Sequence, residues 1–431
     1  MRGVSSGRFG VEFSEPVRDP VWKDVYLPAA FLPILESAPF VKLMGIRQLG
    51  PAYLAYPGAT HTRFSHSIGV FEMARRTLAE LFSKYELPYV TRTGAVSFLA
   101  AALCHDIGHF PFAHSLKELP LREHEALTAD RVLEAPLKPL LKAAGADPEI
   151  VAATVDFSRP DGRDPQVSLF RRLLSGTLDP DKLDYLTRDA FFCGVPYGIQ
   201  DTDYVLRHLT LAPGDMPGID DRGVMSVENL LFSKYSMYRS VYWHRKVRAA
   251  TAMVKKSVES LLSSGRIRED DLYDLDDSGF QALVEGAGGE EALPALLAFR
   301  GELYGTAFET PFDPEIPGFE ALRDLGRRSD VETRLCRALH SCGLDVEPFE
   351  VIVDLPEPVT FESDLPVVSL SGAGMSTGSV PFGASSTVFR PSVVDAFVRS
   401  LRIVRVFLPE RILSASEGKM ADELGRVLTA L

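Results

Sequence analysis

Apolar residues recur at helical spacing through most of the first 262 residues of this 431-residue chain. One run has apolar side chains at intervals of three and four positions: Phe71, Ala74, Leu78 and Leu81. The same spacing returns in two later runs: Val96, Leu99, Ala100 and Leu103, and then Val205, Leu206 and Leu209. Because residues three and four positions apart share one face of a helix, the pattern predicts amphipathic helices. We therefore expect a short segment over 1–28, followed by a helical body over 29–262.

Short runs of strand-forming residues interrupt or follow this helical pattern. VWKDVYLP, near the start, has the composition of a short strand, and LTLAPGDMPGIDDRGVMSV (209–227) predicts a hairpin around a Gly/Pro/Asp turn. FEVIVDLP (349–356) and LRIVRVFLP (401–409) also have strand composition. The Gly/Ser-rich stretch between them, 369–387, predicts a mobile loop. With helices expected over about 268–343 and 417–430, we predict a helical plus α+β region over 263–431.

The charge balance excludes several classes of partner. The chain has 46 basic and 59 acidic side chains, a net charge of −13, which argues against strong non-specific binding to nucleic acid or to an anionic membrane. The longest apolar run, near 95–104, is about half of the roughly 20 residues that span a bilayer. The start, MRGVSSGRFGVEFSEP, lacks the apolar core of a signal peptide. We expect a soluble, cytoplasmic protein.

The cysteines show no spacing typical of a metal site or a disulfide framework. There are four of them, without a CxxC pair: Cys104, Cys193, Cys336 and Cys342. In a chain of this length they are expected to be free thiols of a reducing compartment.

Histidines gather in one part of the chain, where six of the nine lie between His61 and His124. His105 and Asp106 follow the apolar run AVSFLAAALC, and His109, four residues after His105, is expected one helical turn further along. Burial of an unpaired carboxylate costs several kcal/mol, so Asp106 is expected to have a cationic or metal partner. Imidazole with carboxylate is a ligand set for Zn, Fe, Mn or Ni, and a bound ion would acidify its water. The alternative is a helix end with a hydrogen-bonded histidine.

Flanking motifs extend this pair into an ordered pattern. YPGATHTRFSHSIGV (56–70) contributes His66, and LDPDKLDYLTRD (178–189) contributes Asp181, which gives H…HD…D. The sequence now resembles the HD-domain phosphohydrolase superfamily, and within it the dGTPase-like deoxynucleoside triphosphate triphosphohydrolases. Four blocks carry this resemblance in order over roughly 16–250: GIRQLGPAYLAYPGATHTRFSHSIGV, ALCHDIGHFPFAHS, HEALT and DPDKLDYLTRDAFFCGVPYG.

The resemblance implies a fold and a cofactor. The fold is mostly α, an HD-domain helical core with a small β-hairpin and a small α+β C-terminal region. The cofactor is a divalent metal ion (Mn, Mg, Fe, Ni or Zn), and the implied ligands are His66, His105, Asp106 and Asp181. Family members are commonly oligomers, so a homo-oligomer is also implied.

The resemblance also implies roles for three more histidines near the reaction centre: His109, His114 and His124. A nearby imidazole can donate a proton to a leaving oxygen or stabilise charge on a phosphate. Of these we expect His114 to be the proton donor, with His124 beside it. The alternative for each is a histidine that only hydrogen-bonds to neighbouring side chains.

Substrate-binding residues follow from the same blocks. By resemblance, Arg63 and Lys182 hold phosphate oxygens, Tyr185 and Asp189 contact the sugar, and Gln48 and Leu49 approach the nucleoside; a later helix over 232–248 adds Lys234, Tyr242 and His244. The alternatives are ion pairs for the charged residues, including Asp189 with Arg188, and packing for the others. A tyrosine ring against the 2′ carbon would exclude a ribose hydroxyl.

Some positions depart from the family pattern. Phe110 stands where a glycine is usual, which is expected to reshape the pocket. Lys117 replaces an acidic residue that would orient the catalytic histidines, although Glu118 follows it. Val41 and Met44 replace polar and basic residues of a guanine-nucleotide regulatory site, which argues against that kind of activation.

The implied activity is the hydrolysis of a dNTP to the deoxynucleoside and tripolyphosphate, by attack of metal-activated water on the α-phosphorus. One alternative keeps the metal and changes the substrate, giving a phosphomonoesterase or phosphodiesterase on a nucleotide or another phosphorylated small molecule. Another is a nucleotide-binding regulator with a silent site.

Overall fold

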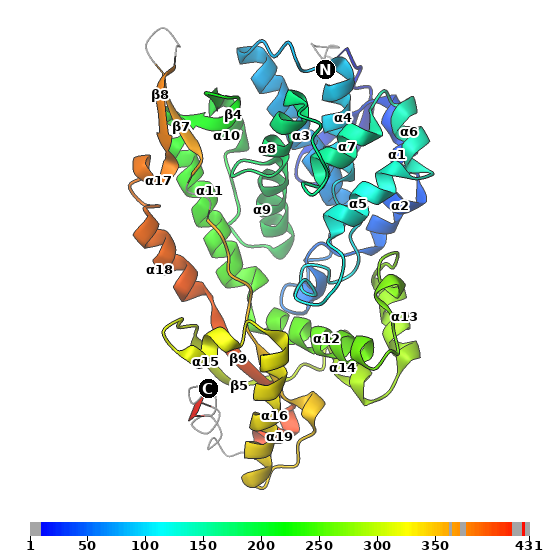
Figure 1. Cartoon of the computed structure of the whole chain (residues 1–431), viewed down its shortest axis with the longest axis vertical. Helices are drawn as coiled ribbons and strands as arrows, with labels where there is room; N and C mark the ends of the chain where they lie inside the picture. Colours follow the sequence, from blue (N-terminus) through cyan, green and yellow to red (C-terminus); the bar gives the residue numbers. More distant parts are fainter. Residues whose placement is uncertain (1–9, 362–363, 371–375, 416–424, 427–431) are drawn as a thin grey trace.

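The computed structural model describes residues 10–361, 364–370, 376–415 and 425–426. Helices dominate this part of the chain and the sheets are small, as the sequence predicted (Figure 1). The chain enters the fold as an antiparallel pair of strands, β1 (Glu15–Asp19) and β2 (Lys23–Leu27). The strand expected in VWKDVYLP is therefore present as β2.

The helical body follows without a long strand. Its short first helices are α1 (Leu32–Leu35) and α2 (Ala38–Val41). The longer elements that carry the predicted site are α3 (Arg63–Lys84), α4 (Arg92–Cys104), α5 (His124–Leu133), α9 (Pro180–Cys193), α11 (Val224–Met237) and α12 (Arg245–Ser263). Between them lie α6 (Leu137–Ala143), α7 (Pro148–Val155), α8 (Pro165–Leu174) and α10 (Thr202–His208). A π-helical turn, Tyr238–Tyr242, connects α11 to α12.

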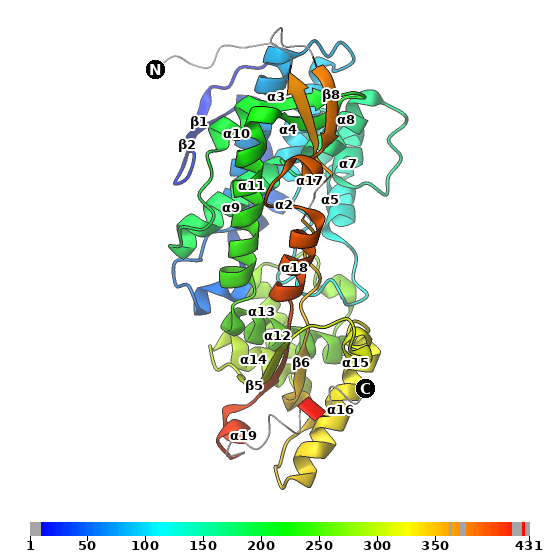
Figure 2. The ribbon, with the colours of Figure 1, turned by 90° about the vertical axis from the view of Figure 1, so that its left-hand side faces the viewer.

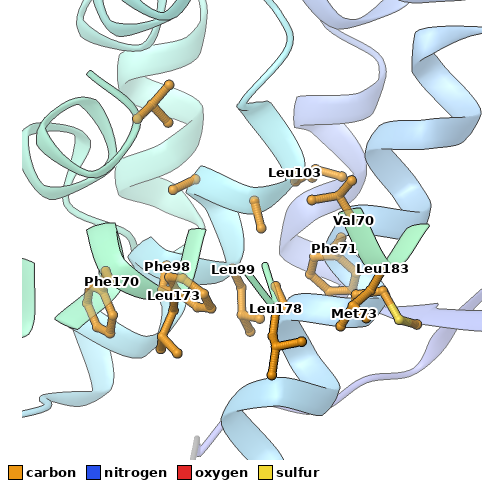
Figure 3. Close-up of a cluster of buried hydrophobic side chains, with 14 of the residues drawn as sticks. Val70, Phe71, Met73, Phe98, Leu99, Leu103, Phe170, Leu173, Leu178 and Leu183 are labelled. Atoms are coloured by element: carbon orange, nitrogen blue, oxygen red, sulfur yellow. The ribbon is translucent and has the colours of Figure 1, made fainter. Parts of the chain in front are cut away.

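The core of this body lies between α3, α4, α8 and α9. Figure 3 shows their apolar side chains meeting, with Phe71 beside Leu183 and Phe98 beside Leu173. The stripe predicted on α3 is fully buried at Phe71, Ala74, Leu78 and Leu81. Neighbouring elements surround helix α4, and its residues from Gly94 to Cys104 are all buried. A helix that is buried on every side needs apolar residues on every side, which α4 has. This buried helix ends where the His-Asp pair begins.

Helix α9 has well-defined ends, which fix the positions of its acidic side chains. The Asp179 carboxylate accepts a hydrogen bond from the backbone N–H of Lys182 (2.7 Å) and so caps the first turn, with Pro180 at the first helical position. Gly194 ends the helix with φ of +68°, the left-handed conformation that glycine adopts easily. Asp181 and Asp184, three residues apart, therefore share the face turned to α3.

The hairpin expected over 209–227 is confirmed and is part of a larger sheet. Strands β3 (Leu209–Ala212) and β4 (Met216–Asp220) are antiparallel, and β4 pairs in parallel with β7 (Pro366–Leu370), which pairs with β8 (Ser376–Pro381). The prediction of a loop over 369–387 was wrong where the chain forms β8 and the short helix α17 (Phe382–Ser385). Residues 371–375 lie outside the described residues. Backbone pairing to β7, including Val367 with Val380, outweighs the weak strand propensity of Gly and Ser.

Most of the remaining elements form the lower part of Figure 1, while α18 (Pro391–Leu401) lies higher, beside α11. They are α13 (Asp277–Ala287), α14 (Leu293–Phe299), β5 (Gly305–Pro311), α15 (Pro317–Ala321), α16 (Leu325–Ser341), β6 (Ile352–Asp354), α18 (Pro391–Leu401), β9 (Ile403–Leu408) and α19 (Glu410–Ala415). The strands predicted near 349–356 and 401–409 are present as β6 and β9. The helix expected over 268–343 is interrupted by β5, an error of prediction, because β5 pairs with β9 far along the chain.

The last part of the chain returns along the body. Figures 1 and 2 show α18 running beside α11, where the rings of Phe397 and Tyr235 stack at 4.5 Å. Of the final helix predicted over 417–430, all but residues 425–426 lie outside the described residues. Among the described helices, none combines the length and the apolar character needed to cross a bilayer.

Candidate active site

Three separate helix ends bring the predicted metal ligands together. His66 lies in the first turn of α3, His105 and Asp106 follow the end of α4, and Asp181 lies in the first turn of α9. Nε2 of His66 is 2.9 Å from Oδ1 of Asp181, and Nε2 of His105 is 3.4 Å from Oδ1 of Asp106 and 3.9 Å from Oδ1 of Asp181. We call these four residues the acidic–histidine cluster.

The turn after α4 places this pair differently from a continued helix. The backbone N–H groups of Ile107 and His109 bond three residues back, to Cys104 and Asp106, so the helix ends at Cys104. The expectation that His109 follows His105 one helical turn along was therefore wrong. Gly108 allows the turn to touch α5, since a Cβ there would lie 2.3 Å from the backbone nitrogen of Thr128.

A buried network behind the cluster orients His66. Nδ1 of His66 lies 2.8 Å from Oδ2 of Asp184, which leaves Nε2 to face Asp181. Arg188 binds Asp184 through two hydrogen bonds of 2.7 and 2.9 Å and binds Asp19 at 2.8 Å. Asp184 also accepts a hydrogen bond from the indole of Trp22. A carboxylate on the far nitrogen of a ligating imidazole fixes its tautomer and raises its basicity.

The cluster concentrates negative charge around two imidazoles. Burial opposes protonation of His66, but Asp181 and Asp184 outweigh it and raise the pKa of His66 to about 10. Burial alone would raise the pKa of Asp106, yet Arg63, at 2.5 Å, holds that pKa well below its usual range. Burial opposes ionisation of Asp181 too, but its pKa is lowered as well, chiefly by His66, so the carboxylates of Asp106 and Asp181 stay ionised at neutral pH. Imidazole nitrogens and ionised carboxylate oxygens are the donor set of a divalent transition metal or manganese ion. His66, His105 and Asp106 offer ligand atoms that all lie within 4.8 Å of one another, and Asp181 contacts His66 and His105, so the donor chemistry fits the metal that the sequence predicted.

The other three predicted histidines form a second group, which we call the histidine triad: His109, His114 and His124. Nε2 of His109 lies 3.2 Å from Nε2 of His114, and the rings of His109 and His124 are 4.3 Å apart. Burial and the charge of Arg63 hold the pKa of His109 well below its usual range and lower the pKa of His114 to about 4. Burial and the neighbouring His114 hold the pKa of His124 low as well. The three imidazoles are thus neutral at pH 7.

Both groups border one cavity of about 1150 Å³. The acidic–histidine cluster, His114 and His124 line it, and so do these predicted substrate residues: Gln48, Leu49, Arg63, Lys182, Tyr185, Asp189, Lys234 and Tyr242. The segment 355–360, which follows β6, closes part of the wall, and Lys234 holds it by donating to the carbonyl oxygen of Thr360 (2.7 Å). The C-terminal part of the chain therefore helps to enclose the site.

Two cations of the wall are already paired with carboxylates. Arg63 binds Asp106, while Nζ of Lys182 lies 2.7 Å from Oδ2 of Asp179 and 2.8 Å from the carbonyl oxygen of Gly176. Ion pairs, the alternative for these residues, are thus present. Despite these ion pairs, both side chains line the cavity, where an anion can bind to them.

Aromatic and acidic groups form another part of the wall. Asp189 accepts a hydrogen bond from the hydroxyl of Tyr242 (2.7 Å) and lies 2.8 Å from Nε2 of His61. Burial keeps the pKa of Tyr185 and of Tyr242 well above the usual value, so both phenols remain protonated. Asp189 does not pair with Arg188, the alternative considered from the sequence, because Arg188 binds Asp184 and Asp19.

The structure does not bring every predicted residue to the cavity. His109 lies behind the wall, and His244 caps α12, its Nδ1 accepting from the backbone N–H of Lys246 (3.3 Å). Phe110 packs on Tyr273 in the apolar core and is not among the residues that line this cavity. Val41 and Met44 are exposed outside the cavity wall.

Lys117, which departs from the family pattern, and Glu118, which follows it, both form ion pairs with other residues. Lys117 pairs with Glu123 at 3.3 Å, and Glu118 is bound by Arg328 at 2.9 Å and by Lys255. Glu118 therefore does not orient the histidines. The carboxylate nearest the triad is instead that of Glu125, 3.1 Å from Nδ1 of His124.

Sequence reasoning missed the residues that support the ligands. Asp184 and Arg188 were visible as charged residues at helical spacing beside Asp181, a signal that they share its face. Nothing in the sequence pointed to Asp19, Trp22 or His61, which reach the site only through the tertiary fold.

Comparisons with known proteins agree with this arrangement. Residues 63–165 match the HD domain family and residues 200–378 match the HD associated region. The chain is 33% identical over 264 residues to an uncharacterized protein of Methanocaldococcus jannaschii, covering 61% of this chain and 53% of that protein. It is 23% identical over 300 residues to the deoxynucleoside triphosphate triphosphohydrolase SAMHD1 of Homo sapiens, covering 62% of this chain and 47% of that protein. The match thus spans about half of each of these relatives.

Solved structures show the same fold over nearly the whole chain. A hypothetical protein from Aquifex aeolicus superposes with a TM-score of 0.70 and 24% identity, covering 95% of this chain and 99% of that one. A phosphohydrolase from Bacteroides thetaiotaomicron superposes with a TM-score of 0.69 and 21% identity, covering 91% and 99%. At this identity the likeness concerns the fold.

Proposed function

Because this chain belongs to the HD-domain phosphohydrolase superfamily, we propose that it hydrolyses a deoxynucleoside triphosphate to the deoxynucleoside and tripolyphosphate. The observation that carries the proposal is the convergence of His66, His105, Asp106 and Asp181 on the wall of a cavity that also presents cations and a Tyr–Asp pair. The volume, about 1150 Å³, is large enough for a whole nucleotide.

The acidic–histidine cluster holds the divalent ion, which when bound supplies Lewis acidity and a water that is acidic near neutral pH. The chain's own residues do the rest. Asp184 keeps Nε2 of His66 directed at the cluster, and Arg188 keeps Asp184 ionised in the interior. The ionised carboxylates of Asp106 and Asp181 supply the negative charge that a divalent cation requires.

Arg63 and Lys182 bind the phosphates in this proposal. Both line the cavity on the same side as the acidic–histidine cluster, and each can exchange part of its bonding to a carboxylate for a phosphate oxygen. Charge that develops on the α-phosphoryl oxygens is then met by cations already in place, which is where electrostatic preorganisation lowers a barrier.

His114 is proposed to protonate the leaving deoxynucleoside oxygen. It lies on the cavity wall, and its Nε2 contacts Nε2 of His109, so a proton can be shared between the two rings. Its pKa is lowered to about 4 by burial and by Arg63. A bound triphosphate adds negative charge beside it and neutralises Arg63, which raises this pKa toward the range that suits a general acid.

The sugar is proposed to lie between Tyr185 and Asp189. The hydroxyl of Tyr242 and Nε2 of His61 hold Asp189 from two sides, which leaves its carboxylate able to accept a further hydrogen bond from a 3′ hydroxyl. Tyr185 packs near Tyr242, with ring centroids 6.4 Å apart, so its ring has little freedom to move away from a 2′ hydroxyl. This arrangement favours deoxyribose over ribose.

The test is an assay of the metal-loaded protein against each dNTP, each NTP and each dNMP, with the products separated by ion chromatography. Tripolyphosphate and deoxynucleoside in equal amounts from at least one dNTP is the expected result. Release of single phosphate from a dNMP would replace the proposal by a phosphomonoesterase. Binding without turnover of any of these compounds would replace it by a nucleotide-binding regulator.

A further inference from the structure

The histidine triad has the geometry of a metal site separate from the acidic–histidine cluster. The ring nitrogens that its members offer all lie within 4.8 Å of one another. Nε2 of His109 and Nε2 of His114 are 3.2 Å apart, so an ion about 2.1 Å from both would see them at an angle of about 100°. That angle lies between the tetrahedral and octahedral values.

Two of the imidazoles already have a partner on Nδ1. Nδ1 of His124 lies 3.1 Å from a carboxylate oxygen of Glu125, and Nδ1 of His109 lies 3.4 Å from the carbonyl oxygen of Phe110. Metal-bound histidines generally donate their other N–H to a carboxylate or a backbone carbonyl. With protons on Nδ1, the Nε2 lone pairs of both rings are available.

The charges around the triad tolerate a cation. Arg63 and Lys117 oppose it, whereas Asp106, Asp181 and Glu125 favour it. Arg63 is paired with Asp106 at 2.5 Å and Lys117 with Glu123 at 3.3 Å, so the two opposing charges are largely compensated.

We propose that His109, His114 and His124 bind a second divalent transition-metal ion, Zn²⁺ or one of similar softness, with a coordination position open to the cavity. Three imidazoles without a carboxylate ligand select Zn²⁺, Ni²⁺ or Cu²⁺ over Mg²⁺ and Mn²⁺, which prefer oxygen. The acidic–histidine cluster accepts both groups of ions, so the two sites differ in selectivity.

A consequence follows for catalysis, and it rests on the proposed function. An ion on the triad occupies the nitrogen of His114 that would carry the proton to the leaving oxygen. Excess Zn²⁺ therefore inhibits a protein whose first site holds Mn²⁺. Binding at the triad does not itself depend on that function, because it requires only the three imidazoles.

The experiment is a Co²⁺ and Zn²⁺ titration of the untagged, metal-stripped full chain, followed by calorimetry and by the visible absorption of bound Co²⁺. The native chain is expected to bind two ions, His124→Ala one, and Asp181→Ala one. His114→Ala provides a second triad variant on the cavity wall, and His244→Gln is a control outside the cavity that retains two ions. Mn²⁺ is expected to bind once.

The outcomes separate the two proposals. A native stoichiometry of one, or a second ion that persists in both His124→Ala and His114→Ala, would overturn the triad site. Circular dichroism of each variant identifies any loss caused by unfolding, in which case the other variant decides. Absence of dNTP hydrolysis would leave these stoichiometries unchanged, so it would count against the proposed function alone.

Discussion

The acidic–histidine cluster and the histidine triad border the same cavity, yet their imidazoles have opposite electrostatic surroundings. His66 sits between two carboxylates, and its pKa is raised to about 10, whereas burial and Arg63 lower the pKa of His114 to about 4. Without a bound metal, the imidazole is thus charged in one place and neutral in the other. Position relative to Asp181, Asp184 and Arg63 decides which.

The comparison teaches how one turn of chain can separate two functions. His105 and His109 are four residues apart in sequence, but α4 ends at Cys104, just before them, and the turn that follows makes them face different groups. The carboxylate after His105 belongs to the first group, whereas the second group consists of three imidazoles, with the carboxylate of Glu125 contacting Nδ1 of His124. Variants that exchange or remove these features test whether the distinction controls activity.

The largest effect is expected from Asp106→Ala. Loss of this ligand removes the cation and leaves Arg63 buried without its partner. Metal stabilisation of a transition state is worth several kcal/mol, so kcat/KM for dNTP hydrolysis should fall by about 10³-fold or more. Steady-state kinetics with elemental analysis checks this, with Asp221→Ala, an exposed carboxylate outside the cavity, as the control. Full activity with unchanged metal content would break the account.

A smaller loss is expected from His114→Gln. General acid catalysis contributes about 10²–10⁴-fold, so kcat should fall by about that factor while KM changes little. Because a general acid must be protonated, native kcat should fall as pH rises through the pKa of His114 in the substrate complex, and the variant should lose this fall. His244→Gln is the matched control, and its kcat should stay within about twofold of native because His244 lies outside the cavity wall. Equal losses in both variants would contradict the role of the triad.

Gly69→Ala tests the support behind the first group. A Cβ at Gly69 would lie 1.9 Å from Oδ1 of Asp184 and 2.4 Å from Nη2 of Arg188. Displacing a carboxylate that orients a ligating histidine costs about 10–100-fold in metal affinity. Overpacking should also lower the free energy of unfolding by about 1–3 kcal/mol. Calorimetric metal titration and urea unfolding measure the two effects.

The control for this substitution is Gly286→Ala on α13, where nothing lies within 4 Å of an added Cβ. Alanine is the better helix former there, so this variant should be neutral or more stable by up to about 1 kcal/mol. Metal affinity equal to native in both variants would show that Asp184 does not orient His66.

The smallest effect is the pH dependence of stability in the metal-stripped protein. The folded-state pKa of His66 is raised to about 10, so its contribution is complete below about 6.5 and is lost as pH rises toward 10. The folded-state pKa of His124 is depressed, so its contribution is complete above about 6.5 and is lost as pH falls. His66 therefore limits the free energy of unfolding at alkaline pH, and His124 limits it at acid pH.

Urea unfolding between pH 5 and 9 measures the acid and alkaline limbs of the curve of unfolding free energy against pH. His66→Gln should flatten the alkaline limb and leave the acid limb, whereas His124→Gln should do the reverse. A flattening of the same limb in both variants would show that the two groups do not differ in their electrostatic surroundings.

The sequence predicted much of the fold because its strongest signals were local. The stripe on α3 and the all-apolar α4 required burial, and the hairpin at β3 and β4 had its turn residues in place. β5 and β8 escaped prediction because their pairing partners lie far away in the chain, or because Gly and Ser hide the strand pattern. Those strands are stabilised by tertiary pairing more than by propensity.

The candidate site was predictable only as far as its motifs reached. His66, the His-Asp pair and Asp181 carry a pattern, and the fold brings them together. Asp19 reaches Arg188 and Trp22 reaches Asp184 from over 160 residues away, through contacts for which no local rule exists. The split of the histidines into two groups depended on where α4 ends, and helix ends are the least predictable part of a helix.

The most direct test is anomalous diffraction from crystals grown with Mn²⁺ and a non-hydrolysable dNTP analogue, measured at the manganese edge. The account predicts one strong peak bonded to His66, His105, Asp106 and Asp181, with the α-phosphate beside it. A peak elsewhere in the fold, or density in which Asp181 stays out of bonding reach of the ion, would contradict it.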